Sequence, residues 1–458
     1  MSDDRSQRFQ RGAARIAAFA SLSYAVDYSF QLVDIFWVAR LGAGAPTAVA
    51  IASSALFLVL ALNEVVGAGT VPLFAQTAGS GDRKRTGFVI LQALFVKLVL
   101  GAVMALIFGA FMLWVAPRYD IDAAARGHLG AYGKVIWLSL LFVPVYSTMM
   151  TALRSLGGEA DAARASALAL LLNMVLNPLL IFGVGSWPGL GITGAAWATV
   201  FAQAVATMLA ARALARNRFG ARVFSAANLG WCPQLYRSIA IIGLPLGGVM
   251  ILYNLEQAAV TAIAVSFGTS VSDGFGISAR ICGFLFMAVF GIAVGASVTV
   301  GLHLGAERAD VVRRALPRFA GVGTAAFGLV ALPLAFFGED LIGLFTQDAV
   351  SVAAGGTYLQ FMAAALCLLC VHHVFNAAFE GAGRNMPVLF ASAAMYLGVE
   401  LPVVLVLAYL HVLTPEALWA AMTVTASAGA LFSVRLFHRG GWLAESLSQK
   451  RMQEDQAT

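Results

Sequence analysis

This chain of 458 residues has few charged side chains: Asp, Glu, Lys and Arg make up 11% of it, whereas 60% of its residues are hydrophobic. Soluble proteins carry about 25% charged residues, so the composition excludes an ordinary water-soluble fold of this length. Cysteine is also scarce. Cys232, Cys282, Cys367 and Cys370 are too few and too dispersed for a disulfide framework. With 46 Gly and only 13 Pro, the chain suits closely packed membrane helices better than a loop-rich secreted fold.

The sequence also lacks the residue patterns of enzymes and metal sites. No nucleophile, histidine and carboxylate stand out as a catalytic set, so we predict neither an enzyme nor a cofactor. The Gly-rich turn at 79–81 is not followed by Lys-Ser or Lys-Thr, unlike a phosphate-binding loop. Cys367, Cys370 and His373 share one helical face, but small packing residues show the same spacing and no fourth ligand is evident. We therefore predict no metal site.

Long apolar runs are what the chain has in abundance. A run of about 20 apolar residues can cross the hydrocarbon core of a membrane as a helix. We identify twelve and predict an all-α polytopic membrane protein, whose first run is a retained helix rather than a cleaved signal peptide. The approximate cores of the twelve spans are 13–39, 47–75, 87–116, 129–152, 165–183, 192–211, 238–266, 274–301, 319–337, 352–379, 387–410 and 417–434.

Lys and Arg are divided unevenly between the two ends of these spans. With the N-terminus in the cytoplasm, 23 of the 29 basic residues fall in cytoplasmic segments and four in outer segments. Cytoplasmic loops of membrane proteins carry this excess. The net charge of +6 therefore indicates topology, with both termini cytoplasmic, and gives no reason to predict nucleic-acid binding.

The two halves of the sequence resemble each other when they are aligned without gaps so that Gly42 meets Gly268. In this repeat alignment, four further glycine pairs fall at matching helix ends: Gly69 with Gly295, Gly79 with Gly305, Gly130 with Gly356, and Gly157 with Gly383. Each half holds six spans, so we expect two six-helix lobes related by a pseudo-two-fold axis along the membrane normal, flanking a substrate site. The predicted parts are an N-terminal lobe (1–211), a cytoplasmic basic connection (212–237), a C-terminal lobe (238–440) and a cytoplasmic tail (441–458).

Seven charged residues are candidates for charges inside the membrane, away from the ends of the predicted spans. Each costs about 2.5–3.5 kcal/mol at the bilayer centre, so each is expected to face a partner or a water-filled cavity. Glu64 and Lys97 lie at matching depths, which favours a structural ion pair. For Glu256 and Arg280 an ion pair and a role in a substrate cavity both remain open, and His373 is expected to line the same pathway. The seven are Asp27, Asp34, Glu64, Lys97, Glu256, Arg280 and Glu400.

Asp34 and Asp27 have no basic residue at matching depth in the first half of the chain. Their spacing of seven places both on one helical face. Amide and hydroxyl side chains from three other spans share the outer third of the membrane with Asp34. Such a cluster can hold a proton or a small hard cation. We therefore predict an ion-coupling site made of Asp34, Asp27, Asn173, Asn177, Tyr132 and Thr199.

Four segments of the chain resemble the multidrug and toxic compound extrusion (MATE) family of transporters. They are Val-Asp-Ile-Phe-Trp-Val-Ala-Arg-Leu-Gly (33–42), Ala-Leu-Arg-Ser-Leu-Gly (152–157), Asn-Met-Val-Leu-Asn-Pro-Leu-Leu-Ile-Phe-Gly (173–183) and Gly-Ile-Thr-Gly-Ala-Ala-Trp-Ala-Thr (191–199). The resemblance implies two six-helix lobes around a central cavity. It also implies a coupling aspartate at Asp34, a hydroxyl at Tyr132, an amide at Asn173 and a hydroxyl at Thr199.

The resemblance further implies a function. Family members export organic, often cationic, compounds in exchange for inward H⁺ or Na⁺. Asn177 stands where many cation-coupled relatives have Asp, and Na⁺ prefers several charged oxygens, so we expect H⁺ coupling. The chain is thus expected to be a monomeric antiporter in the bacterial inner membrane, in contact with lipids and a small-molecule substrate. The alternatives are a lipid-linked oligosaccharide flippase of the same superfamily, or a channel or receptor without ion-coupled transport.

Overall fold

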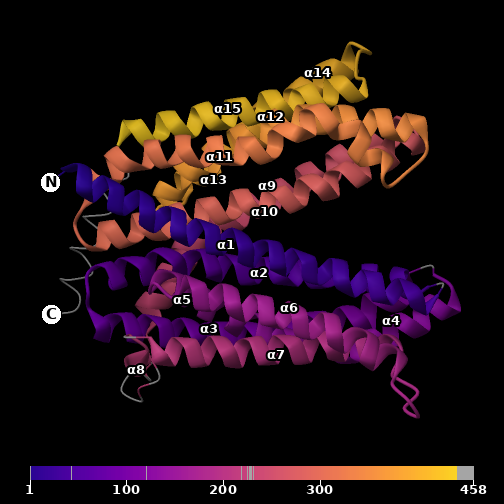
Figure 1. Cartoon of the computed structure of the whole chain (residues 1–458), viewed down its shortest axis with the longest axis horizontal. Helices are drawn as coiled ribbons and strands as arrows, with labels where there is room; N and C mark the ends of the chain where they lie inside the picture. Colours follow the sequence, from indigo (N-terminus) through magenta and orange to yellow (C-terminus); the bar gives the residue numbers. More distant parts are fainter. Residues whose placement is uncertain are drawn as a thin grey trace. The chain divides into compact units, whose positions relative to one another are not determined.

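The computed structural model describes residues 2–42, 44–119, 121–217, 219–223, 225, 230 and 232–440, and these residues are almost entirely helical (Figure 1). One isolated β-bridge joins Val184 and Trp187. The helices are α1 (Ser2–Val38), α2 (Ala45–Gly79), α3 (Arg83–Ala110), α4 (Ala123–Ile136), α5 (Ser139–Ser155), α6 (Glu159–Phe182), α7 (Ile192–Arg216), α8 (Gly220–Val223), α9 (Pro233–Ser266), α10 (Thr269–Gly305), α11 (Ala309–Gly343), α12 (Ala349–Ala382), α13 (Met386–Met395), α14 (Leu401–Tyr409) and α15 (Pro415–Arg439). Short 3₁₀ helices follow α1 (η1, Ala39–Leu41) and precede α4 (η3, Ala116–Arg118).

Each of the twelve predicted apolar cores falls, apart from a terminal residue in some, inside one of these helices or inside joined helical pieces. Ten spans of the described residues are long and apolar enough to cross a membrane, and the bent pair α4 and α5 forms an eleventh. The remaining core, 13–39, lies in α1, which is 37 residues long but less apolar because it carries arginines, Asp27 and Asp34. The prediction of an all-helical polytopic membrane protein is confirmed.

Among the described residues, two spans contain a π-helical turn, which inserts one extra residue into the regular helix. The first, η2 (Phe111–Val115), ends the span begun by α3. The second, η5 (Tyr396–Glu400), joins α13 to α14 within one span. Such turns often occur at functional sites, and η5 ends on a buried glutamate, Glu400.

The helices form two compact units, and the division between them falls inside α1 and inside α9. One unit comprises Leu22–Leu244, and the other comprises Met1–Ser21 together with Pro245–Thr458. We call these the first unit and the second unit. Each has its own buried apolar core, with Phe108 and Ile136 in the first and Trp419 and Phe275 in the second. The predicted tail at 441–458 lies outside the described residues, as does part of the connection at 212–237.

Two glycines that the repeat alignment pairs occupy equivalent contacts in the two units. In the first unit, a Cβ added at Gly69 would lie 2.2 Å from the backbone carbonyl oxygen of Ile239 on α9. In the second unit, a Cβ at Gly295 would lie 2.7 Å from the backbone carbonyl oxygen of Ala13 on α1. Ala13 and Ile239 are themselves paired by the repeat alignment. The repeat inferred from glycines therefore corresponds to a repeated helix-to-helix contact.

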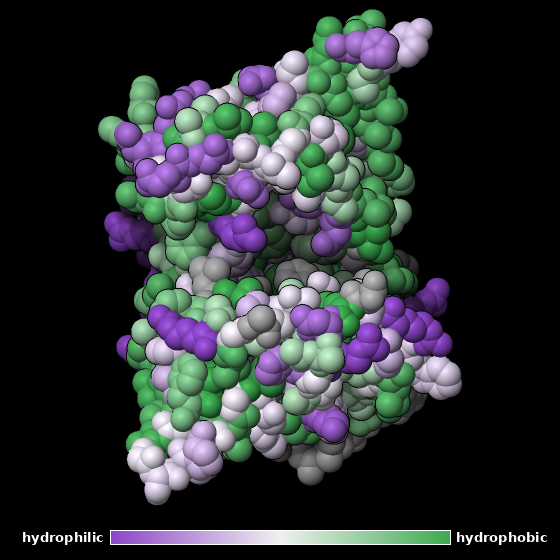
Figure 2. Space-filling model, turned by 90° about the vertical axis from the view of Figure 1, so that its right-hand side faces the viewer, coloured by the Kyte–Doolittle hydropathy of each residue, from purple (hydrophilic) through white to green (hydrophobic). Residues whose placement is uncertain are grey.

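Large apolar side chains remain exposed along the spans of both units. Leu106 and Leu113 in the first unit, and Leu329 and Phe336 in the second, are each about three-quarters exposed. Figure 2 shows one face of the molecule, with hydrophobic residues gathered along its upper right margin and hydrophobic and hydrophilic residues intermixed elsewhere on that face. Apolar surface of this extent would be unfavourable in water and is what a helix presents to lipid.

Candidate functional site

Asp34 of α1 accepts hydrogen bonds from three neutral side chains of the first unit. The amide nitrogen of Asn177 lies 2.8 Å from its Oδ1, and that of Asn173 lies 3.1 Å from the same oxygen. The Thr199 hydroxyl oxygen lies 3.0 Å from Oδ2. These donors come from α6 and α7. Every side chain that contacts the carboxyl group of Asp34 in the described part of the chain is uncharged.

The donors are held in place by their own helices as well. Asn173 and Asn177 are one turn apart on α6, and the Asn177 amide nitrogen also lies 3.1 Å from the backbone carbonyl oxygen of Asn173. The Thr199 hydroxyl lies 3.1 Å from the carbonyl oxygen of Ala195 one turn earlier on α7. All three polar side chains are buried. The cluster is therefore built from rigid helices, which keep its donors directed at Asp34.

Two acceptor atoms in this cluster are left without a partner. The side-chain oxygens of Asn173 and Asn177 are buried and accept no hydrogen bond. A buried amide oxygen normally has a partner, and its absence calls for an explanation. The nitrogen and oxygen of an amide can exchange places by rotation of the side chain. Both oxygens can thus turn toward a bound cation, with Asp34 supplying the negative charge.

Tyr132 and Asp27 complete the predicted set, and the structure places them differently. Tyr132 is buried on α4 and is close enough to Asp34 for an electrostatic interaction. Asp27 lies two turns away from Asp34 along α1 and contacts none of the Asp34 donors. Its neighbours are the Ser166 hydroxyl and the guanidinium group of Arg154. Five of the six predicted residues therefore lie together, and Asp27 has a separate environment.

Lys97 and Glu64 do not form the direct ion pair that their depths suggested. Within the described residues, the Lys97 ammonium group donates to the backbone and side-chain oxygens of Asn63, and it is fully buried. The Asn63 amide nitrogen in turn lies 3.2 Å from a carboxylate oxygen of Glu64. The prediction of direct contact was wrong because depth alone ignores the side chain that stands between the two charges. Asn63 relays the interaction instead.

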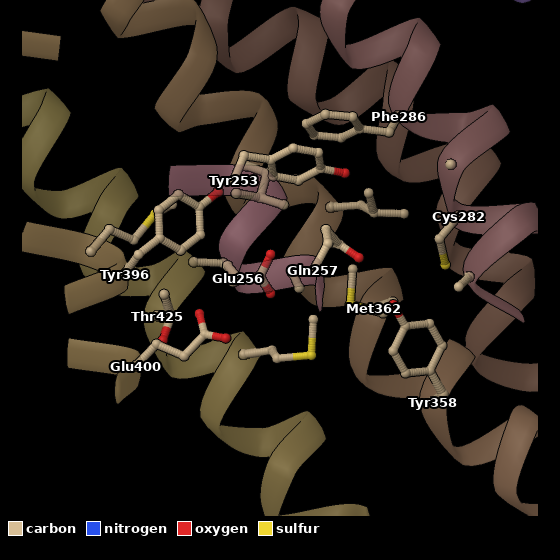
Figure 3. Close-up of a pocket in the computed structure, with 18 residues that line it drawn as sticks. Tyr253, Glu256, Gln257, Cys282, Phe286, Tyr358, Met362, Tyr396, Glu400 and Thr425 are labelled. Atoms are coloured by element: carbon tan, nitrogen blue, oxygen red, sulfur yellow. The ribbon is translucent and has the colours of Figure 1, made fainter. Parts of the chain in front are cut away.

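The second unit contains a pocket with two acidic side chains (Figure 3). Glu256 of α9 and Glu400 at the end of η5 both line it, and their carboxyl groups lie close enough to interact electrostatically. Thr425 of α15 lines the same pocket, and its buried hydroxyl has no hydrogen-bond partner within the described residues. Tyr253, which stacks on Phe286 at 6.1 Å between ring centroids, forms part of the wall. Two carboxyl groups this close can share one proton or hold one cation.

This pocket includes residues equivalent to two in the Asp34 cluster. In the repeat alignment, Tyr132 corresponds to Tyr358 and Thr199 corresponds to Thr425, and both equivalents line the pocket. Asp34 itself corresponds to Val260, one turn from Glu256. Comparing glycines alone did not reveal this relation. The same alignment applied to Tyr132 and Thr199 would have revealed it.

The other two residues assigned to a substrate cavity do not line this pocket. Arg280 is on α10, and its guanidinium group donates to the carbonyl oxygen of Gly276 one turn earlier at 3.0 Å. His373 of α12 packs against Phe286 and Phe290, with ring centroids 5.4 and 5.5 Å apart. Of these contacts only Phe286 belongs to the pocket wall.

His372, unlike His373, is a buried structural residue. Its ring nitrogens lie 2.9 Å from the Ser433 hydroxyl and 3.0 Å from the Asn376 amide nitrogen. The bond to Ser433 joins α12 to α15, whereas Asn376 lies one turn further along α12. Among the described residues, no three His, Cys, Asp or Glu side chains are grouped closely enough to hold a metal ion.

Comparison with known proteins places these observations in a family. A family model described as MatE matches residues 20–179 and 245–406. The chain is 24% identical to the probable multidrug resistance protein YoeA of Bacillus subtilis, with 85% of each chain covered. It is 25% identical to an FAD transporter of Shewanella oneidensis, with 81% of this chain and 82% of the relative covered. A crystal structure of MATE in complex with MaL6 superposes with a TM-score of 0.86 at 19% identity, covering 96% and 97% of the two chains.

Proposed function

Because this chain belongs to the MatE family, whose members are membrane transporters and not enzymes, we propose that it is a secondary active antiporter. It exports hydrophobic or cationic small molecules in exchange for inward-moving H⁺. It works as a monomer in the bacterial inner membrane, with both termini in the cytoplasm. The relative named as a probable multidrug resistance protein supports this class of substrate. The relative named as an FAD transporter supports the alternative that the substrate is a single dedicated metabolite.

The observation that carries the proposal is the lone carboxyl group of Asp34. It accepts bonds from Asn173, Asn177 and Thr199 and faces no fixed cation within the described residues. A membrane carboxylate without a counter-charge is costly unless a moving ion neutralises it. One charge moving inward releases about 2.3 kcal/mol per 100 mV, which sustains roughly a fifty-fold solute gradient. Proton binding at Asp34 therefore supplies an adequate driving force.

Na⁺ is the alternative coupling ion, and one observation favours it. The unpartnered oxygens of Asn173 and Asn177, with Asp34 and Thr199, amount to an oxygen-rich set of ligands after amide rotation. The set holds one negative charge, whereas hard cations prefer sites with several. We therefore keep H⁺ as the principal proposal.

The acidic pocket of the second unit also bears on the substrate. Glu256 and Glu400, with the aromatic wall around Tyr253, can bind the positively charged part of an amphipathic solute. A flippase for anionic lipid-linked sugars needs the opposite charge. The pocket thus supports export of cationic compounds over the flippase alternative.

The decisive experiment is transport in proteoliposomes with H⁺ and Na⁺ gradients imposed separately. A panel of cationic, neutral and anionic compounds is offered to the purified protein. The proposal expects uphill accumulation of cationic compounds driven by the H⁺ gradient. Asp34→Asn should reduce this uptake at least tenfold, because the substituted side chain cannot exchange a proton.

The matched control is Asp161→Asn, since Asp161 is an exposed carboxylate of the same unit, paired with Arg164 at 3.1 Å. It should transport as the wild type does. Gradient-driven uptake retained by Asp34→Asn would eliminate Asp34 as the coupling group. Equilibration without accumulation would instead indicate a channel.

A further inference from the structure

Glu64 carries an exposed carboxyl group deep inside a membrane span. It lies on α2, about 22 Å along the helix axis from the end of the helix at Gly79. Its side chain is exposed, whereas that of the preceding residue, Asn63, is only 3% exposed. A charged group at this depth is unfavourable unless it meets a partner or water. The surroundings of Glu64 therefore decide what its charge can do.

The amide group of Asn63 is fixed with its nitrogen toward Glu64. That nitrogen lies 3.2 Å from Oε1 of Glu64. The oxygen of the same amide accepts hydrogen bonds from the Lys97 ammonium group and from the Ser147 hydroxyl, which lies 3.3 Å away. The amide cannot exchange its nitrogen and oxygen without losing both of these bonds. Glu64 is therefore held from one side by a donor whose orientation is set on α3 and α5.

Lys97 places a positive charge behind this amide without covering the carboxyl group. Lys97 is fully buried, and its ammonium group also donates to the backbone oxygen of Asn63. A Cβ added at Gly67 would lie 3.6 Å from Nζ of Lys97 and 3.9 Å from Oε2 of Glu64. The two charges thus lie on either side of one point, which offsets part of the cost of a carboxylate inside the membrane. Within the described residues, Oε2 accepts no hydrogen bond, so it can bind a further group.

The face of α2 that carries Glu64 differs from a lipid-facing surface. Residues at intervals of three or four share one face of a helix. On this face, all residues but one are small or polar: Thr47, Ala50, Ser54, Phe57, Ala61, Glu64 and Ala68. The exposed residues of α3 are instead large and apolar, and they include Phe95, Leu98, Val99, Val103, Leu106 and Ile107. The composition of the α2 face fits a water-filled cavity, where an exposed carboxylate is tolerated.

The repeat indicates that the helices do not need these polar groups in order to pack. In the repeat alignment, Asn63 corresponds to Val289, Glu64 to Phe290 and Lys97 to Gly323. Val289 is fully buried on α10. The second unit therefore forms the corresponding helices with apolar residues and a glycine in place of all three polar side chains. A role outside packing accounts for their presence in the first unit.

We propose that Glu64 is a solute-binding residue, whose exposed carboxylate binds the positively charged nitrogen of an organic cation. The inference rests on the proposed function and deepens it, because it assigns a binding site on α2 for the charged part of the solute. The free Oε2 supplies the opposite charge. The small side chains on either side of Glu64 leave room for the apolar part of the solute.

The first test is equilibrium binding of two fluorescent dyes to the purified protein in detergent, followed by fluorescence anisotropy. Ethidium carries a permanent positive charge, and Nile red is neutral. Glu64→Gln should weaken ethidium binding by about fivefold or more, because it removes one exposed charge–charge contact, and should leave Nile red binding unchanged. Glu416→Gln, which alters an exposed glutamate in the first turn of α15, is the matched control and should bind both dyes as the wild type does.

Two results of this test would overturn the inference. One is an unchanged affinity for ethidium in Glu64→Gln. The other is equal weakening of both dyes, which would indicate a structural role, since loss of a charge has no direct effect on a neutral dye. Glu64→Asp keeps the charge on a shorter side chain and should bind ethidium more tightly than Glu64→Gln does.

A second test uses the wild-type protein and so does not depend on the folding of a variant. A water-soluble carbodiimide with glycinamide converts water-accessible carboxyl groups into amides, which mass spectrometry locates in the sequence. Glu64 should be labelled, and ethidium should protect it from labelling whereas Nile red should not. A Glu64 that is never labelled would lie against lipid or protein, which would overturn the inference.

Neither binding test needs an ion gradient, so the inference and the antiport can fail separately. If the wild type shows no H⁺-driven uptake in proteoliposomes, the proposed function fails, and the dye and labelling results still decide the role of Glu64. If the wild type transports cationic compounds and Glu64→Gln binds ethidium equally well, only the inference about Glu64 fails.

Discussion

Asn177 is the residue that most directly tests which ion the first unit binds. Its amide nitrogen is 2.8 Å from Asp34, so Asn177→Asp would place two carboxyl groups within hydrogen-bond distance. Two adjacent carboxylates repel each other, and a cation that bridges them relieves the repulsion. We expect Asn177→Asp to make uptake dependent on Na⁺ and several-fold less dependent on the H⁺ gradient.

The measurement is uptake of one cationic substrate with each ion gradient imposed in turn. Asn173→Ser serves for comparison, because it removes an amide from the same helix face without adding charge. Unchanged ion preference in Asn177→Asp would mean that the number of carboxylates at this site does not select the ion.

Part of the site could be predicted from individual residues of the sequence. The depths and types of Asp34, Asn173, Asn177 and Thr199 were sufficient to predict that they meet, because side chains at equal depth on neighbouring spans have few other partners. The same reasoning failed for Glu64 and Lys97, where Asn63 intervenes. Depth determines which side chains can meet, and the rotation of each helix about its axis determines which ones do.

At the scale of helices, we expect the close backbone contacts at Gly69 and Gly295, which the repeat alignment pairs, to matter for stability. A Cβ at residue 69 would lie 2.2 Å from the Ile239 carbonyl oxygen, and one at residue 295 would lie 2.6 Å from the Ala17 backbone nitrogen. The obstructing atoms are backbone and cannot rotate away. Gly69→Ala and Gly295→Ala should therefore each destabilise the protein by about 1–3 kcal/mol.

Thermal unfolding of the purified variants in detergent measures this effect. Gly109→Ala is the control, because the space around Gly109 on α3 is open for 4 Å. Its unfolding temperature should change little. If all three variants unfold at the same temperature as the wild type, close backbone approach at residues 69 and 295 contributes nothing to stability.

Helix bounds were the most predictable feature at this scale. All twelve apolar cores coincide with observed helices because the hydrocarbon core requires about 20 apolar residues and leaves no unpaired backbone groups. The bend between α4 and α5 and the π-helical turn η5 were not anticipated. Both depend on packing against neighbouring helices, and the length of an apolar run in the sequence carries no information about that packing.

At the scale of the whole molecule, the direction of insertion is the main prediction from charge. The turn between α2 and α3 and the loop between α6 and α7 are separated by three spans, so they lie on opposite sides of the membrane. In a cysteine-free background, Ser186→Cys should react with a membrane-impermeant maleimide on intact cells, whereas Ser80→Cys should react only after lysis. Both serines are exposed. The reverse labelling pattern would invert the proposed topology.

Composition and periodicity by themselves determined that this is a helical membrane protein with two similar halves, because lipid admits few chain conformations and charge bias follows insertion. They also indicated Asp34 as the unusual acidic residue. Only the tertiary structure decided which side chains surround each charge. It separated Asp27 from the Asp34 cluster, and it brought Glu400 to Glu256. The reason is that such contacts depend on how each helix is rotated about its axis and packed against its neighbours. Residues that are far apart in the chain determine that rotation and packing jointly.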